Sequence, residues 1–394
     1  MTPNRPVVNT VLPATSSASR YAHIDAMRAV AVMLVVVGHA GIGHIVPGGA
    51  GVTIFFAISG FIITTLLLKE WDRTGGFDVG GFYTRRLVKL APPLVVVLVI
   101  PTIVYAAVGG LINWSAFVGQ ILFYFNWIKL DHPDVFPGSA VVWSLSIEEQ
   151  FYIVFALLWL WLVKSPHAIR WLGIASIVTI IVSTGLRVLL ATPGDEHIAD
   201  RIYYGSDTRA DSLAWGVLAA LLLRRWHKSK PTAGLIERWS GSGWVLITAV
   251  LVFLVSLSIR DDWFRQTIRY TLQSITTCAV IIYGFNASGG FAAAIFARLS
   301  RIKAVQLIGL ASYSIYLVHL SLIMLFKDYL DTWPLAARVV AFTALSTVVG
   351  ILIYKLVEVP ARKMYDELRE RRMVRGRRSS GRRLRGGAEV REMA

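Results

Sequence analysis

The chain has 394 residues, of which 55% are hydrophobic and only 16% charged, and its formal net charge is +16. Soluble globular proteins carry about 25% charged residues, so this composition excludes a soluble globular protein for most of the chain. The excess of Lys and Arg indicates membrane orientation and contact with anionic lipid rather than nucleic-acid binding. The single cysteine, Cys278, excludes an intramolecular disulfide.

Apolar runs along the chain predict an all-α polytopic membrane protein with about ten transmembrane helices, since a span needs about 20 mainly apolar residues. These runs lie at residues 27–46, 51–68, 90–112, 144–163, 171–191, 209–225, 243–259, 267–285, 304–326 and 337–359. A further run, 116–128, is short and contains Gln120 and Asn126. We expect an interfacial or re-entrant segment there.

Loop charges predict that both termini are cytoplasmic, because basic loops alternate with acidic or mixed ones along the chain. The basic segments are the N-terminus, 69–89, 164–170, 224–238, 298–303 and the C-terminal tail. We therefore expect a cytoplasmic N-terminal segment (1–22), a transmembrane domain (23–360) and a basic cytoplasmic tail (361–394). Residues 1–20 are polar and contain proline, so we expect no cleaved signal peptide.

The first predicted span contains two ionisable residues, Arg28 and His39, which are eleven residues apart. On an α-helix this spacing places both on nearly the same face, about 16 Å apart along the axis. Arg28 can be a cation that only sets the orientation of the span in the membrane, and His39 can be a buried structural histidine. We favour function for His39, because histidine is well suited to take a proton from a hydroxyl near neutral pH.

Three cations, Arg85, Arg86 and Lys89, precede the Pro92-Pro93 pair at the cytoplasmic side of the third span. They are either membrane anchors or a phosphate-binding group for an anionic cytosolic cofactor such as a nucleotide thioester.

In the second span, Ser59 is not surrounded by the Gly-x-Ser-x-Gly motif of a nucleophilic serine. We therefore expect its side chain to pack or to form hydrogen bonds.

The segment 143–152 carries Ser146 and two adjacent carboxylates, Glu148 and Glu149, at the start of a predicted span. The carboxylates can simply interact with the helix dipole. Because this start lies on the outer side, near the depth of His39, we expect one glutamate to hydrogen-bond to His39 and fix its tautomer. Adjacent residues point about 100° apart on a helix, so the sequence leaves open which glutamate does so.

Further polar residues lie in or next to later spans. Tyr203 precedes Arg209 and Asp211, which either pair with each other or bind a sugar or a carbonyl oxygen. His319 lies mid-span and Glu358 ends the last span, and we favour a structural role for both. The eight histidines lack HExxH and HxH spacing, so we predict no metal site.

The ordered set of these segments resembles the acyltransferase family 3 membrane proteins, which are bacterial O-acyltransferases of cell-surface glycans and some secreted metabolites. The matching pieces are Arg28-x10-His39, Gly51–Phe61, Phe82–Pro93, Trp143–Tyr152, Thr208–Asp211, Ser312–His319 and Glu358–Arg362. The resemblance spans about residues 22–363. Many members carry an additional extracytoplasmic hydrolase-like domain, and we expect none in this chain, which ends in a basic tail.

The resemblance implies three groups of site residues. The implied catalytic residues are His39, Glu148 and Glu149. The implied donor-binding residues are Arg28, Tyr83, Arg85, Arg86 and Lys89. The implied acceptor or oxyanion residues are Ser146, Tyr203, Arg209, Asp211 and His319. Lys89 departs from the family's Arg-Arg-x-x-Arg motif, which weakens its phosphate role because lysine lacks the bidentate guanidinium.

The expected function is transfer of an acetyl or succinyl group from cytosolic acyl-CoA to a hydroxyl of an envelope polysaccharide or glycolipid. Acyl-CoA is then a co-substrate, with no permanently bound cofactor, and the protein lies in the bacterial cytoplasmic (inner) membrane. The envelope acceptor can be a glycan such as lipoarabinomannan, and the alternative acceptor is a macrolide-type secondary metabolite. A proton-coupled transporter, with His39 and the glutamates as relay, is the alternative class. The absence of recognisable inverted repeats argues against it.

Overall fold

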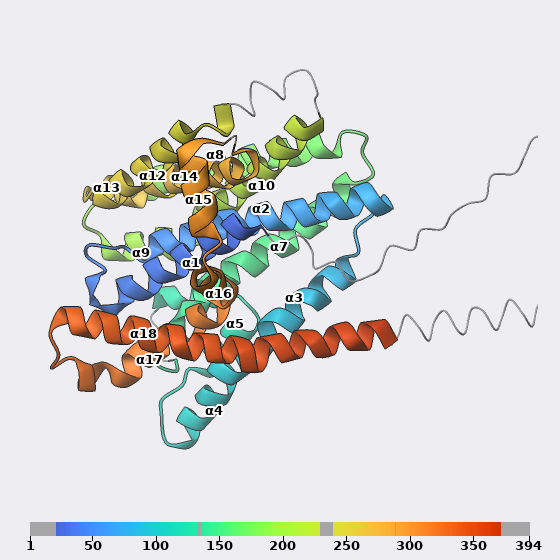
Figure 1. Ribbon diagram of the computed structural model, residues 1–394. Helices are drawn as coiled ribbons and strands as arrows, with labels where there is room; N and C mark the ends of the chain where they lie inside the picture. The colour runs from blue at the N-terminus through green and yellow to red at the C-terminus, as the bar shows by residue number, and fades with distance from the viewer. Residues whose placement is uncertain (1–20, 132–134, 229–238, 288, 372–394) are drawn as a thin grey trace, which may run out of the picture.

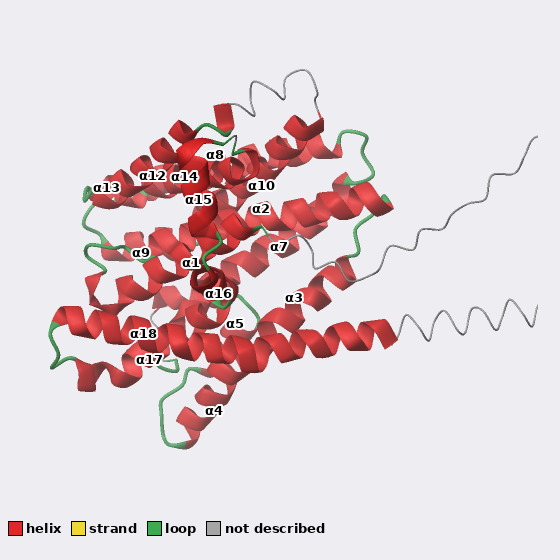
Figure 2. Ribbon diagram, viewed as in Figure 1, coloured by secondary structure: helices red, strands yellow, loops and turns green. Residues whose placement is uncertain are grey.

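The computed structural model describes residues 21–131, 135–228, 239–287 and 289–371, and the regular elements in these ranges are all helices (Figure 2). The longer helices are α1 (Ala22–Val37), α2 (Gly49–Thr74), α3 (Val79–Leu94), α7 (Trp143–Leu162), α8 (Ala168–Leu190), α10 (Ser206–Lys228), α12 (Gly243–Ser258), α14 (Ile268–Asn286), α17 (Ser312–Leu330) and α18 (Leu335–Ile353). The shorter ones are α4 (Ile100–Ala107), α5 (Trp114–Ile121), α6 (Phe125–Ile128), α9 (Glu196–Tyr204), α13 (Asp262–Gln266), α15 (Gly290–Ser300) and α16 (Lys303–Leu310). The predicted all-α class is therefore confirmed.

Turns of π or 3-10 geometry interrupt or extend these helices. The π-helical turns are η1 (Gly38–Ile42), η2 (Val95–Val99) and η5 (Tyr354–Glu358), and the 3-10 turns are η3 (Lys129–Asp131) and η4 (Ser139–Val142). Helix continues from η5 to Arg371, so the first part of the predicted tail extends the last span. Most of the predicted N-terminal segment, most of the 224–238 loop and the rest of the tail lie outside the described residues.

Six helical segments of the described chain are long and apolar enough to cross a membrane. They are Ala22–Ile42, Gly49–Thr74, Val79–Ala107, Ser139–Leu162, Ala168–Leu190 and Leu335–Arg371. Two helix pairs raise this number to eight if each is one bent span: α14 with α15 (99°) and α16 with α17 (73°). The protein is thus a polytopic helical membrane protein.

The predicted count of ten spans is not supported. The predicted spans at 209–225 and 243–259, which form α10 and α12, are not among the helices that are long and apolar enough to cross a membrane. Helix α12 has only 16 residues, and α10 carries charged residues in its first two turns and again in its last two. Of the charged residues near its start, Arg209 and Asp211 are buried inside the protein rather than turned toward lipid, whereas Asp207 is partly exposed and pairs with Arg201. The sides on which the termini lie stay a prediction.

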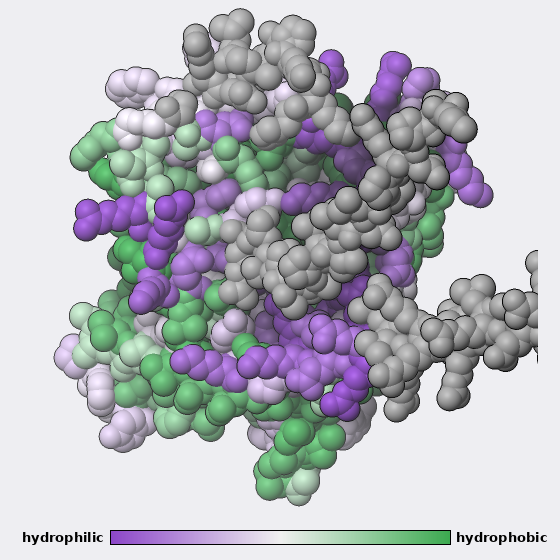
Figure 3. Space-filling model, turned by 45° about the vertical axis from the view of Figure 1, so that its right-hand side comes forward, coloured by the Kyte–Doolittle hydropathy of each residue, from purple (hydrophilic) through white to green (hydrophobic). Residues whose placement is uncertain are grey.

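Large apolar side chains are exposed on the outer faces of several helices, as expected of surfaces that contact lipid. Examples are Ile103 and Val104 on α4, Ile181 and Val182 on α8, and Leu251 and Leu254 on α12. Figure 3 shows such an apolar surface along the lower edge of the molecule.

The segment 116–128, for which we expected an interfacial or re-entrant piece, forms two short helices, α5 and α6. The break between them contains Phe123, which has a positive φ of 58°. Its two polar residues face inward, since Gln120 donates to Ser139 and Asn126 donates to the backbone of Tyr204. Neither helix is long enough to cross a membrane.

Helix α2 packs against both α1 and α10 (Figure 1). A Cβ atom at Gly60 on α2 would lie 1.9 Å from the backbone oxygen of Leu213 on α10. A Cβ atom at Gly216 on α10 would lie 2.1 Å from the backbone oxygen of Ala57 on α2. Small residues allow this close approach of two membrane helices, and only glycine fits at both positions.

The contact between α2 and α10 generates a stability prediction. We expect Gly216→Ala to lower the midpoint of thermal unfolding in detergent, because overpacking of a well-packed contact costs about 1–3 kcal/mol. Tryptophan fluorescence during heating measures this. Gly185→Ala on α8 is the control, because no atom lies within 4 Å of its added Cβ. Equal destabilisation by both variants would contradict the close-contact interpretation.

Candidate active site

His39 lies where the first span departs from α-helical geometry. Helix α1 ends at Val37 and continues as the π-turn η1, within which Gly41 has a φ of +128°. Such a φ strongly favours glycine, and π-turns often occur at functional sites. The His39 side chain is exposed at this turn, whereas the neighbouring Ala40 is buried.

The hydrogen bonds of His39 define its tautomer. Its Nδ1 lies 2.9 Å from the backbone oxygen of Val35. A carbonyl oxygen only accepts hydrogen bonds, so Nδ1 carries the proton in the neutral ring. Nε2 is then the nitrogen with a free lone pair, and it is the atom able to take a proton from a bound hydroxyl. The buried His319 lies against the same ring, with its Nε2 3.4 Å from Nδ1 of His39.

The two glutamates of α7 bind Arg86 of α3, not His39. Arg86 donates from Nε to Glu149, and its Nη2 lies 3.3 Å from Oε2 of Glu148. Ser59 donates a hydrogen bond of 3.0 Å to Glu148, which is the hydrogen-bonding role expected for it. The predicted glutamate–His39 pair is therefore wrong. Glu148 and Glu149 lie more than one turn inside α7, which begins at Trp143, and they face α2 and α3 instead.

A cavity of about 160 Å³ lies between these helices. Its polar wall contains Arg28, Arg86, Lys89, Glu148 and Ser312, and its apolar wall contains Phe55, Phe56, Tyr313 and Tyr316. Arg28 donates from Nε to Ser312, at 3.2 Å. Of the five predicted donor-binding residues, the structure brings Arg28, Arg86 and Lys89 together here.

The other two predicted donor-binding residues, Arg85 and Tyr83, are not among the residues that line the cavity. Arg85 is exposed and lies 3.9 Å from Glu70. The Tyr83 hydroxyl is buried and has no hydrogen-bond partner among the described residues. His39 also lies outside the walls of the cavity, although Arg28 and His39 share the first span.

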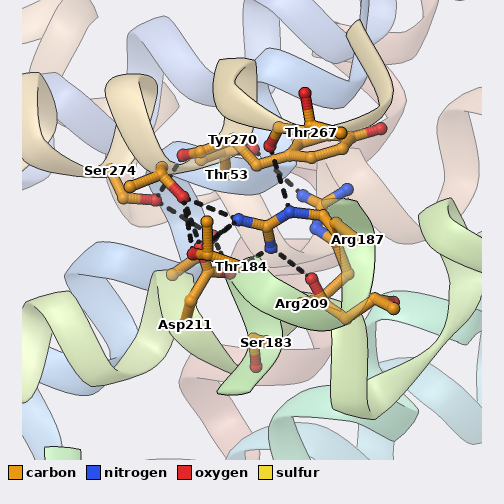
Figure 4. A network of polar contacts seen from close by, with 12 residues as sticks. Thr53, Ser183, Thr184, Arg187, Arg209, Asp211, Thr267, Tyr270 and Ser274 are labelled. Carbon is orange, nitrogen blue, oxygen red and sulfur yellow. Dashed lines mark hydrogen bonds and ion pairs between the residues drawn. The ribbon is translucent and has the colours of Figure 1, made fainter. Parts of the chain in front are cut away.

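Asp211 pairs with Arg187 of α8, not with Arg209 (Figure 4). Arg187 donates from Nη1 and Nη2 to the two carboxylate oxygens, at 2.9 and 2.7 Å. It also donates from Nε to the backbone oxygen of Thr267 next to α14. Arg187, Arg209 and Asp211 are all 0% exposed. Of the two interpretations given for Arg209 and Asp211, pairing with each other is therefore wrong, and the sequence analysis missed Arg187 although an arginine inside a span is a signal.

Arg209 lies beneath aromatic rings. Its guanidinium carbon is 4.0 Å from the ring centroid of Tyr270 and 5.4 Å from that of Tyr203. Its Nη2 donates to Thr53, whereas Nε and Nη1 have no partner among the described residues. Cation–π contact is thus the main interaction of this buried charge.

The predicted acceptor group does not converge on one point. The Ser146 hydroxyl is buried and donates to the backbone of Val142 one turn earlier in the chain. Tyr203 lines a second, polar cavity, and burial raises the pKa of its hydroxyl to about 12, so it stays a hydrogen-bond donor at neutral pH. The Tyr203 ring lies against Gly49, and the His39 ring lies against the adjacent Gly48.

The described residues contain no group of three His, Cys, Asp or Glu side chains that could hold a metal ion. The candidate site therefore consists of a cation-lined cavity, a histidine with a free Nε2 beyond it, and a polar cavity beside the same glycine turn. The cations of the cavity can donate hydrogen bonds to a bound molecule, and the free Nε2 can take a proton from a hydroxyl.

Comparison with known proteins gives a match to the acyltransferase domain family over residues 21–355. The relatives include O-acetyltransferase OatA of Staphylococcus aureus (strain NCTC 8325), 29% identical over 366 residues. A second Staphylococcus aureus protein (strain COL), named provisionally as an O-acetyltransferase, is 29% identical over 361 residues. Both alignments cover 86% of this chain and 57% of the relative, so the chain spans little more than half of their length. No solved structure matches the chain.

The buried pair of Arg187 and Asp211 generates a second stability prediction. We expect Asp211→Asn to destabilise the protein by about 3–5 kcal/mol, because it leaves buried guanidinium groups without a counter-charge. Thermal unfolding in detergent measures the effect. Asp262→Asn is the matched control, since Asp262 forms an exposed pair with Arg265 and such pairs contribute about 1 kcal/mol or less. A similar loss of thermal stability in both variants would show that the buried ion pair contributes no more than an exposed one.

Proposed function

Because this chain belongs to the acyltransferase domain family, which its match over residues 21–355 establishes, we propose that it transfers an acyl group from acyl-CoA to a hydroxyl acceptor. The donor enters from the cytosol, and the acceptor is a polysaccharide or glycolipid of the bacterial envelope on the outer side. Acetyl is the preferred group, since relatives are named O-acetyltransferases, and succinyl is the alternative. The protein then lies in the bacterial cytoplasmic membrane.

The observation that carries the proposal is the cavity that holds Arg28, Arg86 and Lys89. Glu148 and Glu149 both bind Arg86, so these five groups together carry one net positive charge. This near balance suits the uncharged acyl-pantetheine arm of CoA better than its phosphates. We therefore place the arm in the cavity, with Arg28 and Lys89 as hydrogen-bond donors. We place the phosphates toward the exposed Arg85.

His39 performs the proton transfer in this proposal. Its Nε2 takes the proton of the acceptor hydroxyl while the oxygen attacks the thioester carbonyl carbon. The C–S bond breaks, and the leaving CoA thiolate receives the proton from the imidazolium. An acyl-His39 intermediate is the alternative sequence of steps. We place the acceptor in the polar cavity beside Tyr203, which adjoins the Gly48–Gly49 turn that contacts His39.

The first functional prediction concerns His39. We expect His39→Ala to lower the rate of acyl transfer by about 10²–10⁴-fold, because it removes the general base. Detergent-purified protein is incubated with labelled acetyl-CoA or succinyl-CoA and envelope glycan, and free CoA and labelled product are followed. His44→Ala, an exposed histidine of the following loop, is the control and should keep its activity.

The same assay separates the proposed enzyme from a transporter. Turnover in detergent needs no proton gradient, whereas transport does. Absence of His39-dependent CoA release with either donor, together with absence of donor binding, would contradict acyl transfer and favour the proton-coupled transporter.

A second functional prediction concerns the donor cavity. We expect Lys89→Met to raise the KM for acyl-CoA by about tenfold with little change in kcat, because it removes one charged hydrogen bond to the bound arm. Lys164→Met is the matched control, since Lys164 is exposed on a loop between α7 and α8. If both variants raise KM equally, the effect is general electrostatic attraction and the cavity assignment fails.

A further inference from the structure

His319 is fully buried on α17 and lies against His39, 280 residues earlier in the chain. The ring centroids of the two histidines are 5.1 Å apart, with the planes tilted by 56°. Helix α17 reaches this position after the 73° bend that separates it from α16. Among the described residues no carboxylate is hydrogen-bonded to His39, and His319 is the side chain that contacts its Nδ1.

The hydrogen bonds of His319 decide which of its nitrogens carries the proton. Its Nδ1 lies 2.6 Å from the backbone oxygen of Tyr316, which can only accept. Nδ1 of His319 therefore carries the proton of the neutral ring, and Nε2 has a free lone pair. That lone pair faces Nδ1 of His39 at 3.4 Å. The distance is long for a hydrogen bond, and such contacts often tighten during catalysis.

Two acceptors consequently face the same nitrogen of His39, the Val35 oxygen and Nε2 of His319. A proton on Nδ1 of His39 satisfies both of them. In the other tautomer, three lone-pair atoms would face one another without a proton, which costs free energy because Val35 and His319 are buried. The arrangement therefore selects the Nδ1–H tautomer and leaves Nε2 as the base.

Tyr316 fixes the position of His319 relative to the donor cavity. Its hydroxyl donates to the Val141 backbone oxygen at 3.0 Å and contacts Ser144 at 2.6 Å, so α17 is tied to the start of α7. The Tyr316 ring also lines the cavity and lies 5.6 Å from the His319 ring, centroid to centroid. The histidine pair thus adjoins the part of the cavity wall that Tyr316 forms.

We propose that His319 is a positioning residue for His39: it holds the Nδ1–H tautomer and stabilises the imidazolium that forms when Nε2 takes the proton. In serine hydrolases a carboxylate fills this role, and here a neutral imidazole lone pair does so. No bond to His319 forms or breaks, and the reaction remains the transfer described above. The effect of His319 on kcat rests on the proposed function. The tautomer of His39 can be observed without turnover.

Two substitutions at His319 separate positioning from packing. His319→Asn keeps a donor for the Tyr316 oxygen but removes the acceptor that faces His39. His319→Gln can place its amide oxygen where Nε2 lies and so restores that acceptor. We expect His319→Asn to lower kcat by about 10- to 100-fold, with KM for donor and acceptor changed by about twofold or less. His319→Gln should recover most of kcat.

Nitrogen NMR of protein with ¹⁵N-labelled histidine rings supplies a readout without turnover. The His39 signals are assigned by their loss in His39→Ala. In the wild type we expect His39 as the Nδ1–H tautomer, and in His319→Asn a shift toward a tautomer mixture. A wild-type His39 protonated on Nε2, or equal losses of kcat in the Asn and Gln variants with an unchanged tautomer, would overturn the proposal.

The tautomer measurement and the CoA-release assay test different parts of the proposal. If wild-type protein shows the Nδ1–H tautomer but releases no CoA, the arrangement of the histidines stands and the proposed acyl transfer is wrong. If CoA release depends on His39 but the tautomer is unaffected by His319→Asn, acyl transfer stands and the role of His319 is wrong.

Discussion

Buried charges in this protein must be neutralised by its own side chains, because lipid supplies neither water nor counter-ions. The ion pair between Arg187 on α8 and Asp211 on α10 is the strongest case, since both side chains are fully buried and the contact is bidentate. Arg187 also donates to the Thr267 backbone and to Thr271 on α14. The pair therefore joins α8, α10 and α14, and α10 in turn contacts α2 through Gly60 and Gly216.

The same requirement shapes the donor cavity. Arg86 on α3 binds two carboxylates of α7, and Ser59 on α2 completes the coordination of Glu148. Arg86 and its partners thereby connect α2, α3 and α7 beside the cavity. The two carboxylates nearly balance the positive charges around the cavity. Arg86 and Glu148, which hold these helices together, therefore also line the cavity.

His39, the proposed base, lies in irregular backbone. His39 lies in the π-turn η1 at the end of the first span, and α17, which follows the 73° bend after α16, carries His319 to the same place. A straight α1 would place Arg28 and His39 on one face, as the spacing predicts for an ideal helix. In the structure Arg28 lies in the cavity wall and His39 lies outside it.

The sequence by itself determined the membrane class, the all-helical content, the family and most residues of the candidate site, because apolar length, helical spacing and ordered motifs are local properties of the chain. Tertiary structure decided the partners. Glu148 and Glu149 bind Arg86, Asp211 binds Arg187, and His39 contacts His319. A charge inside a span needs a partner, and this much is visible in sequence. Which partner it finds depends on which helices are neighbours and how each is rotated about its axis, and those are set by packing between segments far apart in the chain.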